Sequence, residues 1–292
     1  MHARRAATLV ALAAALTAPL AACGSKHPAP PPVAVTQPAP AGSTPIGSPS
    51  PAASPPPTAA PATSAPPAAA PAAGLPTITY TQAATGFSAD PDQASTALLG
   101  EGLQVNAKSP VYDAPGGQAR AYLTPKISGV DLIMPVVQRS DGWVAVLLPS
   151  MNRSVGWLPP GGWRTVALRD QIVVRRGAFT LTWVRDGVAQ QTWTVTIGAP
   201  ATQTPLGRTF VLGRSSLPNK VYAGLDVLAL GAVPDDKKAV AAGLADAHTG
   251  IHAWYRNEFG YRTSNGCVRM PPAAQKVLLD NIAPGTSVVV LP

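Results

Sequence analysis

A proline-rich segment limits how much of this chain can fold. Between Gly24 and Pro76 nearly every residue is Pro, Ala, Ser, Thr or Gly, and the segment holds half of the chain's 34 prolines and no aromatic residue. Such a composition cannot bury a core, and it favours extended polyproline conformations. About fifty residues at ~3.1 Å each reach on the order of 160 Å. We interpret residues 23–76 as a disordered tether, and a spacer with no length requirement is the alternative.

The residues before this segment are typical of an export signal. Arg4 and Arg5 precede an apolar run, 6–18, that is too short to span a bilayer comfortably. The sequence Leu-Ala-Ala-Cys that ends at Cys23 resembles the bacterial lipobox, in which cleavage leaves a lipidated cysteine at the new N-terminus. The resemblance implies a lipoprotein signal peptide over residues 1–22 and a lipid anchor on the outer face of the bacterial cytoplasmic membrane. An ordinary cleaved signal with a chance cysteine is the alternative.

The remaining residues suffice for one small and one medium domain. Every acidic residue lies in this part, where 19 basic residues face 14 acidic ones once Arg4, Arg5 and Lys26 are left out. So small and dispersed an excess predicts no nucleic-acid partner.

Residues 77–166 read as a small β module. Short apolar stretches alternate with turn residues, which predicts strands at 104–106, 109–113, 130–139, 142–148 and 154–158. The Gly-Trp pairs that contain Trp143 and Trp157 resemble those of bacterial SH3-type domains, so we expect an SH3-like β-barrel. A wall-binding role for the two tryptophans is one interpretation, and we favour the other, in which both are core aromatics.

Residues 167–292 also read mainly as strands. We expect strands at 171–174, 180–185, 191–197, 209–211 and 287–291, a hairpin turn at Asp186-Gly187, and a helix at 273–282 with Pro272 in its first turn. The polar stretch 214–250 reads as a loop whose later part has helical composition. The predicted fold class is mainly β, a small barrel followed by a mixed β-sandwich with one or two helices.

The second module contains a cysteine in a setting that suits catalysis. Cys267 lies in Ser264-Asn265-Gly266-Cys267-Val268-Arg269-Met270, fifteen positions after His252. A thiol with an ordinary pKa near ~8.5 needs a base to act at neutral pH, and His252 is the candidate. The small residues around the thiol would let backbone N–H groups converge as an oxyanion hole. The plain alternative is a small buried hydrophobe.

Together with Ile251, Gly260 and the upstream Thr204-Pro205-Leu206-Gly207 segment, this motif resembles the L,D-transpeptidases, the YkuD-type family of bacterial cell walls. The resemblance covers about 168–292. It implies that Cys267 forms an acyl-enzyme, that His252 is the general base, and that the carbonyl of Ala253 orients the imidazole. It also implies that the 214–250 stretch is a lid and that carbapenems acylate the thiol.

Two motif positions leave alternatives open. Asn265 stands where the family usually has a second histidine, and an amide can hydrogen-bond but cannot titrate. Arg269 is expected to bind a substrate carboxylate, with a solvated surface arginine as the alternative. His248, the other histidine of this module, is expected to be a solvated loop residue. One cysteine and two histidines make a poor ligand set, so we expect no metal and no cofactor.

The sequence thus predicts a lipid-anchored L,D-transpeptidase that cross-links peptidoglycan stem peptides. The predicted site residues are the nucleophile, the base and the residues that shape the site: Cys267, His252, Ser264, Asn265, Gly266, Ala253 and Arg269. An L,D-carboxypeptidase, in which water is the acceptor, is one alternative. A non-catalytic peptidoglycan-binding lipoprotein is the other, and Asn265 is the feature that favours it.

Overall fold

A computed structural model describes residues 65–292, except 83–84, 151–152, 217–219, 237 and 241–247. The predicted signal peptide, Cys23 and most of the predicted tether therefore lie outside the described residues. The described residues belong to one compact unit. No helix within these ranges is long and apolar enough to cross a membrane.

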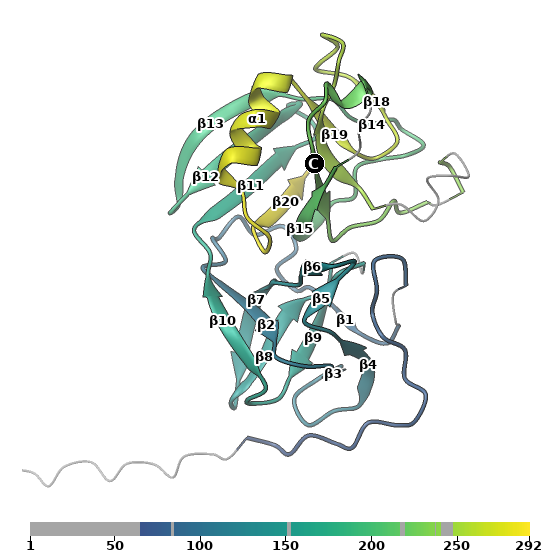
Figure 1. Cartoon of the computed structure of the whole chain (residues 1–292), viewed down its shortest axis with the longest axis vertical. Coiled ribbons are helices and arrows are strands. Elements are labelled where there is room, and N and C mark those ends of the chain that lie inside the picture. The colour runs from purple at the N-terminus through teal and green to yellow at the C-terminus, as the bar shows by residue number, and fades with distance from the viewer. Residues whose placement is uncertain (1–64, 83–84, 151–152, 217–219, 237, 241–247) are drawn as a thin grey trace, which may run out of the picture. The chain divides into compact units, whose positions relative to one another are not determined.

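The first sheet is built from residues 88–167, and its strands run in the order β10-β2-β7-β8-β9-β3-β4, with β1 beside β9 (Figure 1). All its neighbouring strands pair antiparallel. A separate hairpin pairs β5 with β6. The strands are β1 (Ser88–Ala89), β2 (Glu101–Val105), β3 (Ser109–Tyr112), β4 (Ala119–Leu123), β5 (Lys126–Ile127), β6 (Val130–Asp131), β7 (Met134–Ser140), β8 (Trp143–Leu147), β9 (Ser154–Leu158) and β10 (Trp163–Ala167).

Two clusters of buried side chains hold the first sheet. One is aliphatic and contains Leu103, Met134 and Val146, and the other contains Tyr112, Trp143 and Trp157. Trp143 is 0% exposed and Trp157 8%, which confirms both as core aromatics. The SH3-like identity of this module stays a prediction.

The second sheet is mixed and carries the motif residues. Its strands run in the order β13-β12-β11-β20-β15-β16-β17-β19. The pairs β11–β20 and β17–β19 are parallel, and the other neighbours are antiparallel. Its strands, with the short parallel pair β14–β18 and a 3-10 turn η1, are β11 (Asp170–Arg175), β12 (Thr180–Arg185), β13 (Val188–Thr194), β14 (Ile197–Gly198), β15 (Gly207–Ser215), η1 (Lys220–Tyr222), β16 (Val227–Leu230), β17 (Gly250–Ala253), β18 (Arg262–Ser264), β19 (Val268–Met270) and β20 (Ser287–Leu291).

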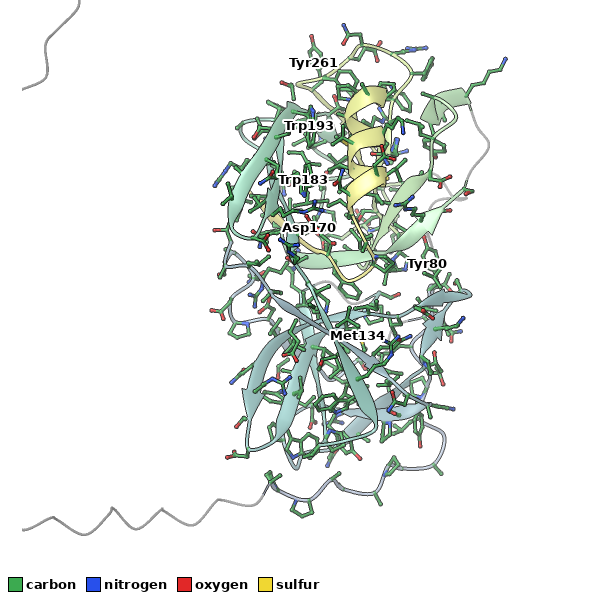
Figure 2. The ribbon with its side chains drawn as sticks, turned by 60° about the vertical axis from the view of Figure 1, so that its left-hand side comes forward. Tyr80, Met134, Asp170, Trp183, Trp193 and Tyr261 are labelled. Carbon is green, nitrogen blue, oxygen red and sulfur yellow. The ribbon has the colours of Figure 1, made fainter. Side chains whose placement is uncertain are left out.

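One α-helix, α1 (Pro272–Asn281), covers a face of this sheet (Figure 1). Proline at its start needs no N–H partner there and sets a helical φ. Leu278 and Leu279 of the helix pack in one cluster with Trp183, and Trp193 lies against that cluster (Figure 2). The carboxylate of Asp170 accepts hydrogen bonds from Trp183 Nε1 (2.8 Å) and Arg185 Nε (2.8 Å). The helix side of the sheet is thus covered by apolar packing, with the hydrogen bonds to Asp170 at its edge.

The predicted fold class, mainly β, is confirmed. The helix begins one residue before its predicted start, and the Asp186-Gly187 turn has φ of 50° and 78°, as a tight hairpin requires. The stretch 214–250 is not the continuous loop that its polarity predicted, because it contains the fully buried strand β16. The helical composition expected after Asp235 falls largely on 241–247, outside the described residues.

A buried ion pair links Asp90, which directly follows β1, to the second sheet. Arg208, on β15, donates from Nε to Asp90 Oδ2 (2.7 Å) and from Nη2 to Oδ1 (2.6 Å). The two side chains are 3% and 0% exposed. Two parallel hydrogen bonds to a carboxylate suit the planar guanidinium, and neither partner can regain water if the other is lost.

We predict that Arg208→Met lowers the free energy of unfolding by about 3–5 kcal/mol, because Asp90 is left buried without its countercharge. Urea unfolding measures the change. Arg169→Met, at the exposed Arg169–Asp186 pair, is the matched control and should change the free energy of unfolding much less, because both groups remain hydrated. The double variant Asp90→Leu/Arg208→Met should recover much of the loss. A small effect of Arg208→Met would contradict a closed, water-free pair.

Candidate active site

Two parallel strands bring the predicted base and nucleophile together. The β17–β19 register pairs Ile251 with Val268 and His252 with Arg269. Because register partners in a sheet point to the same face, Arg269 shares a face with His252, and Cys267 lies two positions before Arg269, directly ahead of β19. Ile251 and Val268 point to the other face and lie in the core. The thiol has a backbone hydrogen bond at Gly250, two positions before His252, and Tyr222 lies close to both Cys267 and His252, so the two predicted residues are brought into one region.

A tight turn between β18 and β19 holds the thiol. The Ser264 hydroxyl accepts from the Gly266 N–H (3.2 Å) and donates to the Cys267 carbonyl (2.5 Å). Gly266 has a φ of 104°, which a residue with a Cβ rarely adopts. The Gly266 N–H, one of two donors expected at the oxyanion, is thus directed at Ser264 here. Ser264 acts as the brace of the turn.

The imidazole of His252 is buried and fixed. His252 is only 4% exposed, and its Nδ1 lies 2.7 Å from the carbonyl oxygen of Ala253. A ring nitrogen that faces a carbonyl carries the proton, so Nε2 is left as the acceptor. The Tyr222 ring packs edge-on against the imidazole at 4.7 Å between centroids. This leaves a single nitrogen available to take a proton.

Burial keeps His252 uncharged. It lowers the pKa of His252 to about 4, against the hydrogen bond to Ala253, which raises it, while Arg269 lowers it further. Desolvation disfavours the charged imidazolium. At neutral pH His252 is therefore a free base.

The thiol of Cys267 is shifted in the opposite sense. Burial raises its pKa, and a backbone hydrogen bond at Gly250 and the charge of Arg269 both lower it by lesser amounts. Cys267 is half-buried and not in a disulfide. The predicted nucleophile and the predicted base thus both rest uncharged, so an attack by this thiol would require proton transfer.

Arg269 lies beside both groups with part of its hydrogen-bonding capacity unused. Its guanidinium stacks on the Trp254 ring at 3.7 Å from the centroid, and Nη1 donates to the Thr263 carbonyl (3.4 Å). Among the described residues, Arg269 Nε and Trp254 Nε1 are buried donors without a partner. Two such donors on adjacent side chains could each donate a hydrogen bond to a carbonyl or carboxylate of a ligand.

The structure also places residues that the sequence did not single out. The Gly250 backbone hydrogen-bonds at the thiol, and Tyr222 packs against the imidazole. Nothing in the sequence near either residue indicates a place in the site. Asn265 is exposed, next to the buried Ser264. The hydrogen bonds that brace the turn do not use its side chain.

His248 is not the solvated loop residue that was expected. It is 8% exposed, its ring stacks on Tyr80 at 3.9 Å between centroids, and its Nδ1 lies 2.6 Å from the Leu230 carbonyl oxygen. Its Nε2 faces the Tyr80 carbonyl and the Ser150 hydroxyl. These partners are far away in sequence, so the local pattern around His248 could not reveal its burial.

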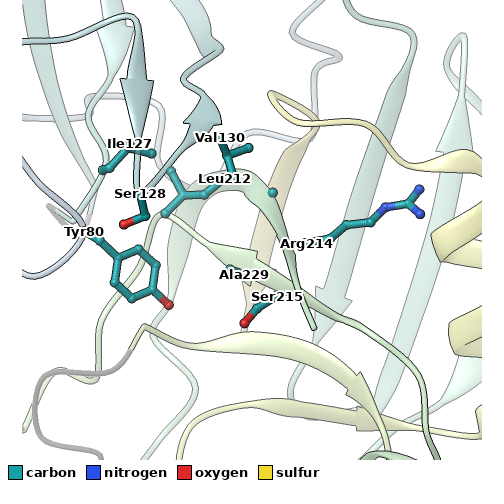
Figure 3. Close-up of a pocket in the computed structure, with 9 residues that line it drawn as sticks. Tyr80, Ile127, Ser128, Val130, Leu212, Arg214, Ser215 and Ala229 are labelled. Atoms are coloured by element: carbon teal, nitrogen blue, oxygen red, sulfur yellow. The ribbon is translucent and has the colours of Figure 1, made fainter. Parts of the chain in front are cut away.

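A pocket of about 230 Å³ shares Tyr80 with this region (Figure 3). Neither Cys267 nor His252 lines it. Burial is the main cause that raises the pKa of Tyr80, a backbone hydrogen bond at His248 lowers it, and Cys267 raises it further. Tyr80 thus lies within electrostatic reach of the thiol. The pocket is lined by Tyr80, Ile127, Ser128, Val130, Leu212, Gly213, Arg214, Ser215 and Ala229.

Solved L,D-transpeptidases resemble the chain only distantly. A variant of the Enterococcus faecium enzyme is 21% identical over 42% of this chain and 50% of that one, with a TM-score of 0.32. The Mycobacterium smegmatis enzyme is 16% identical over 53% and 69%, with a TM-score of 0.32. The Stackebrandtia nassauensis enzyme is 20% identical over 43% and 56%, also at 0.32. The first of these structures is therefore matched over half of its length.

The family comparison is specific to the second sheet. No curated protein matches the sequence. Residues 169–290 match the family model described as the L,D-transpeptidase catalytic domain, YkuD. That range contains β17, β19 and the turn between them, so the part of the chain that is similar to the L,D-transpeptidase catalytic domain includes the motif around Cys267.

Proposed function

We propose that this protein is an exported, lipid-anchored L,D-transpeptidase that cross-links peptidoglycan stem peptides through an acyl-enzyme on Cys267. The observation that carries the proposal is the neutral, fixed His252, whose register partner Arg269 follows the free thiol of Cys267 by two positions. The family of residues 169–290 supports the reaction class. The lipid anchor rests on Leu20 to Cys23 of the sequence alone.

Attack on the donor peptide begins with one proton transfer. As Sγ of Cys267 bonds to the amide carbonyl carbon, Nε2 of His252 takes the thiol proton. The C–N bond then breaks, and the imidazolium returns the proton to the departing amine. A thioester remains on Cys267, and His252 is again neutral.

The second half-reaction transfers the acyl group. The amine of a second stem peptide attacks the thioester, His252 takes a proton from that amine, and the proton returns to the sulfur that leaves. A new amide and the free thiol result. If water attacks instead, the product is a carboxylic acid and the enzyme is an L,D-carboxypeptidase, which differs in the acceptor alone.

Backbone and side-chain donors would stabilise the oxyanion. The Cys267 N–H follows directly after the left-handed Gly266, and the Gly250 backbone already hydrogen-bonds at the sulfur. Removal of one such donor typically slows a reaction by about 10²–10³-fold. Arg269 Nε and Trp254 Nε1 are placed to bind a peptide carbonyl or carboxylate and so orient the substrate.

The nucleophile and base are tested with a carbapenem as the acylating probe. We expect wild-type protein to gain the mass of one carbapenem, Cys267→Ala to gain none, and His252→Gln to react about 10²–10⁴-fold more slowly because no base takes the thiol proton. Intact mass spectrometry follows the adduct. An adduct on Cys267→Ala, or none on wild type, would favour the non-catalytic peptidoglycan-binding alternative.

The rate of acylation should report the pKa of His252. The neutral imidazole is the active form, so the rate rises with pH through a midpoint near the value of about 4 and is level by neutral pH. Acylation quenched at a series of times and followed by mass spectrometry from pH 3 to 8 gives the rate at each pH. The rate of His252→Gln should not rise with pH. A midpoint near the ordinary histidine pKa of ~6.5 would show that the ring is hydrated.

Asn265 should contribute little through its side chain. Because that side chain is exposed and alanine keeps the backbone N–H, Asn265→Ala should change the acylation rate by less than about threefold. The variant serves as a control for changes next to the nucleophile. A loss as large as that of His252→Gln would instead give the amide a direct role in catalysis.

A further inference from the structure

The last part of the proline-rich segment contacts the first sheet. Trp143 Nε1 donates to the Pro66 carbonyl (3.0 Å), and the Tyr112 hydroxyl donates to the Ala69 carbonyl (2.9 Å). Ala65 and Leu75 pack against the cluster of Tyr112, Trp143 and Trp157, which we name the aromatic cluster. The two donors come from different strands, β3 and β8, and reach the same short segment.

The spacing of the two acceptors matches a polyproline II helix. Such a helix has three residues per turn, so the carbonyls of Pro66 and Ala69, three positions apart, face the same side. Pro66, Pro67 and Pro71 fix φ near −65°, and each restricts the residue before it to extended conformations. Between 65 and 73 no residue has a positive φ. The segment is thus held in the conformation that its prolines already prefer.

The sheet is shaped to receive this backbone. Two loop glycines with positive φ, Gly116 and Gly142, lie under the segment, and a Cβ at Gly116 would come within 3.0 Å of Pro66. A Cβ at Gly142 would lie 3.5 Å from Ala65. Trp143 is fully buried, so its indole N–H needs a protein acceptor where water is excluded.

We propose that the aromatic cluster is a binding site for proline-rich peptide in the polyproline II conformation, and that residues 65–71 of the same chain occupy it. Aromatic surfaces with ring N–H or O–H donors suit such ligands, because a stiff segment loses little conformational entropy and its carbonyls are unpaired. None of the contacts described above involves a charged side chain. The site is separate from Cys267 and does not rest on the transpeptidase proposal.

The sequence offers the site a second ligand of nearly the same kind. Pro56-Pro57-Thr58-Ala59-Ala60-Pro61-Ala62 differs from the stretch Pro66 to Ala72 at one position. A variant designed to free the aromatic cluster of its ligand, which we call the release variant, must therefore change both residues 56–62 and residues 66–72. Replacement of Pro56, Pro57, Pro61, Pro66, Pro67 and Pro71 by glycine does so, and glycine replacement of Pro28, Pro30, Pro31, Pro32, Pro38 and Pro40 is the matched control.

The indole N–H signal of Trp143 tests the proposal in the full chain labelled with ¹⁵N-tryptophan. In the release variant it should move, and its hydrogen exchange should become at least about tenfold faster, whereas the matched control keeps the wild-type signal. Trp163 Nε1, bonded to the Pro159 carbonyl, and Trp183 Nε1, bonded to Asp170, are internal references that should not change. An unchanged Trp143 in the release variant would overturn the proposal.

Binding of a separate peptide tests recognition itself. An octapeptide with the sequence of residues 65–72 should return the Trp143 signal of the release variant toward its wild-type position at millimolar concentration, the range that a short linker supplies within one chain. Tyr112→Phe in the same background keeps the ring but removes one hydrogen bond, so it should lower the affinity for the peptide about three- to tenfold. No response at ~10 mM peptide, or equal affinity for Tyr112→Phe, would overturn the site.

Discussion

The parallel pairing of β17 with β19 is the constraint on which the candidate site depends. The two strands are short, yet their register decides which side chains share a face. A slip of one residue would send either His252 or Cys267 into the core and replace it at the site with Ile251 or Val268. The register is held on the core side by those two aliphatic residues and at the turn by the hydroxyl of Ser264, which bonds to both Gly266 and Cys267. Packing on one face of the sheet therefore sets the chemistry on the other.

The same burial that aligns the groups also sets their charge. Desolvation lowers the pKa of His252 and raises that of Cys267, so the site does not rest as a thiolate–imidazolium pair. Arg269 adds a positive charge that favours the thiolate and disfavours the imidazolium, and the guanidinium is held in place by the Trp254 ring. In the proposed reaction, the sulfur would therefore bond to the electrophile as its proton moves to His252.

Local patterns predicted the features that local interactions determine. The helix after Pro271, the Asp186-Gly187 turn and the motif around Cys267 could each be predicted from a few adjacent residues, and the structure places each of them there. Strand β16 and the burial of His248 were missed, because β16 lies within a stretch that is mostly polar and the partners Tyr80 and Ser150 that cover His248 lie about a hundred or more positions away. The contacts of residues 65–71 escaped for a related reason. Their composition predicts a tether without a core of its own, but it carries no information about an aromatic surface supplied by residues 112 and 143.

The neutral resting state of Cys267 also bears on how long the protein survives intact. Oxidants convert the thiolate, not the thiol, to sulfenic acid and then to forms that are not recovered. A cysteine activated by a permanent positive partner would be ready for its substrate and equally ready for peroxide. Burial raises the pKa of the Cys267 thiol, so the burial that would make the proposed reaction depend on proton transfer would also slow the oxidation of Cys267 between turnovers.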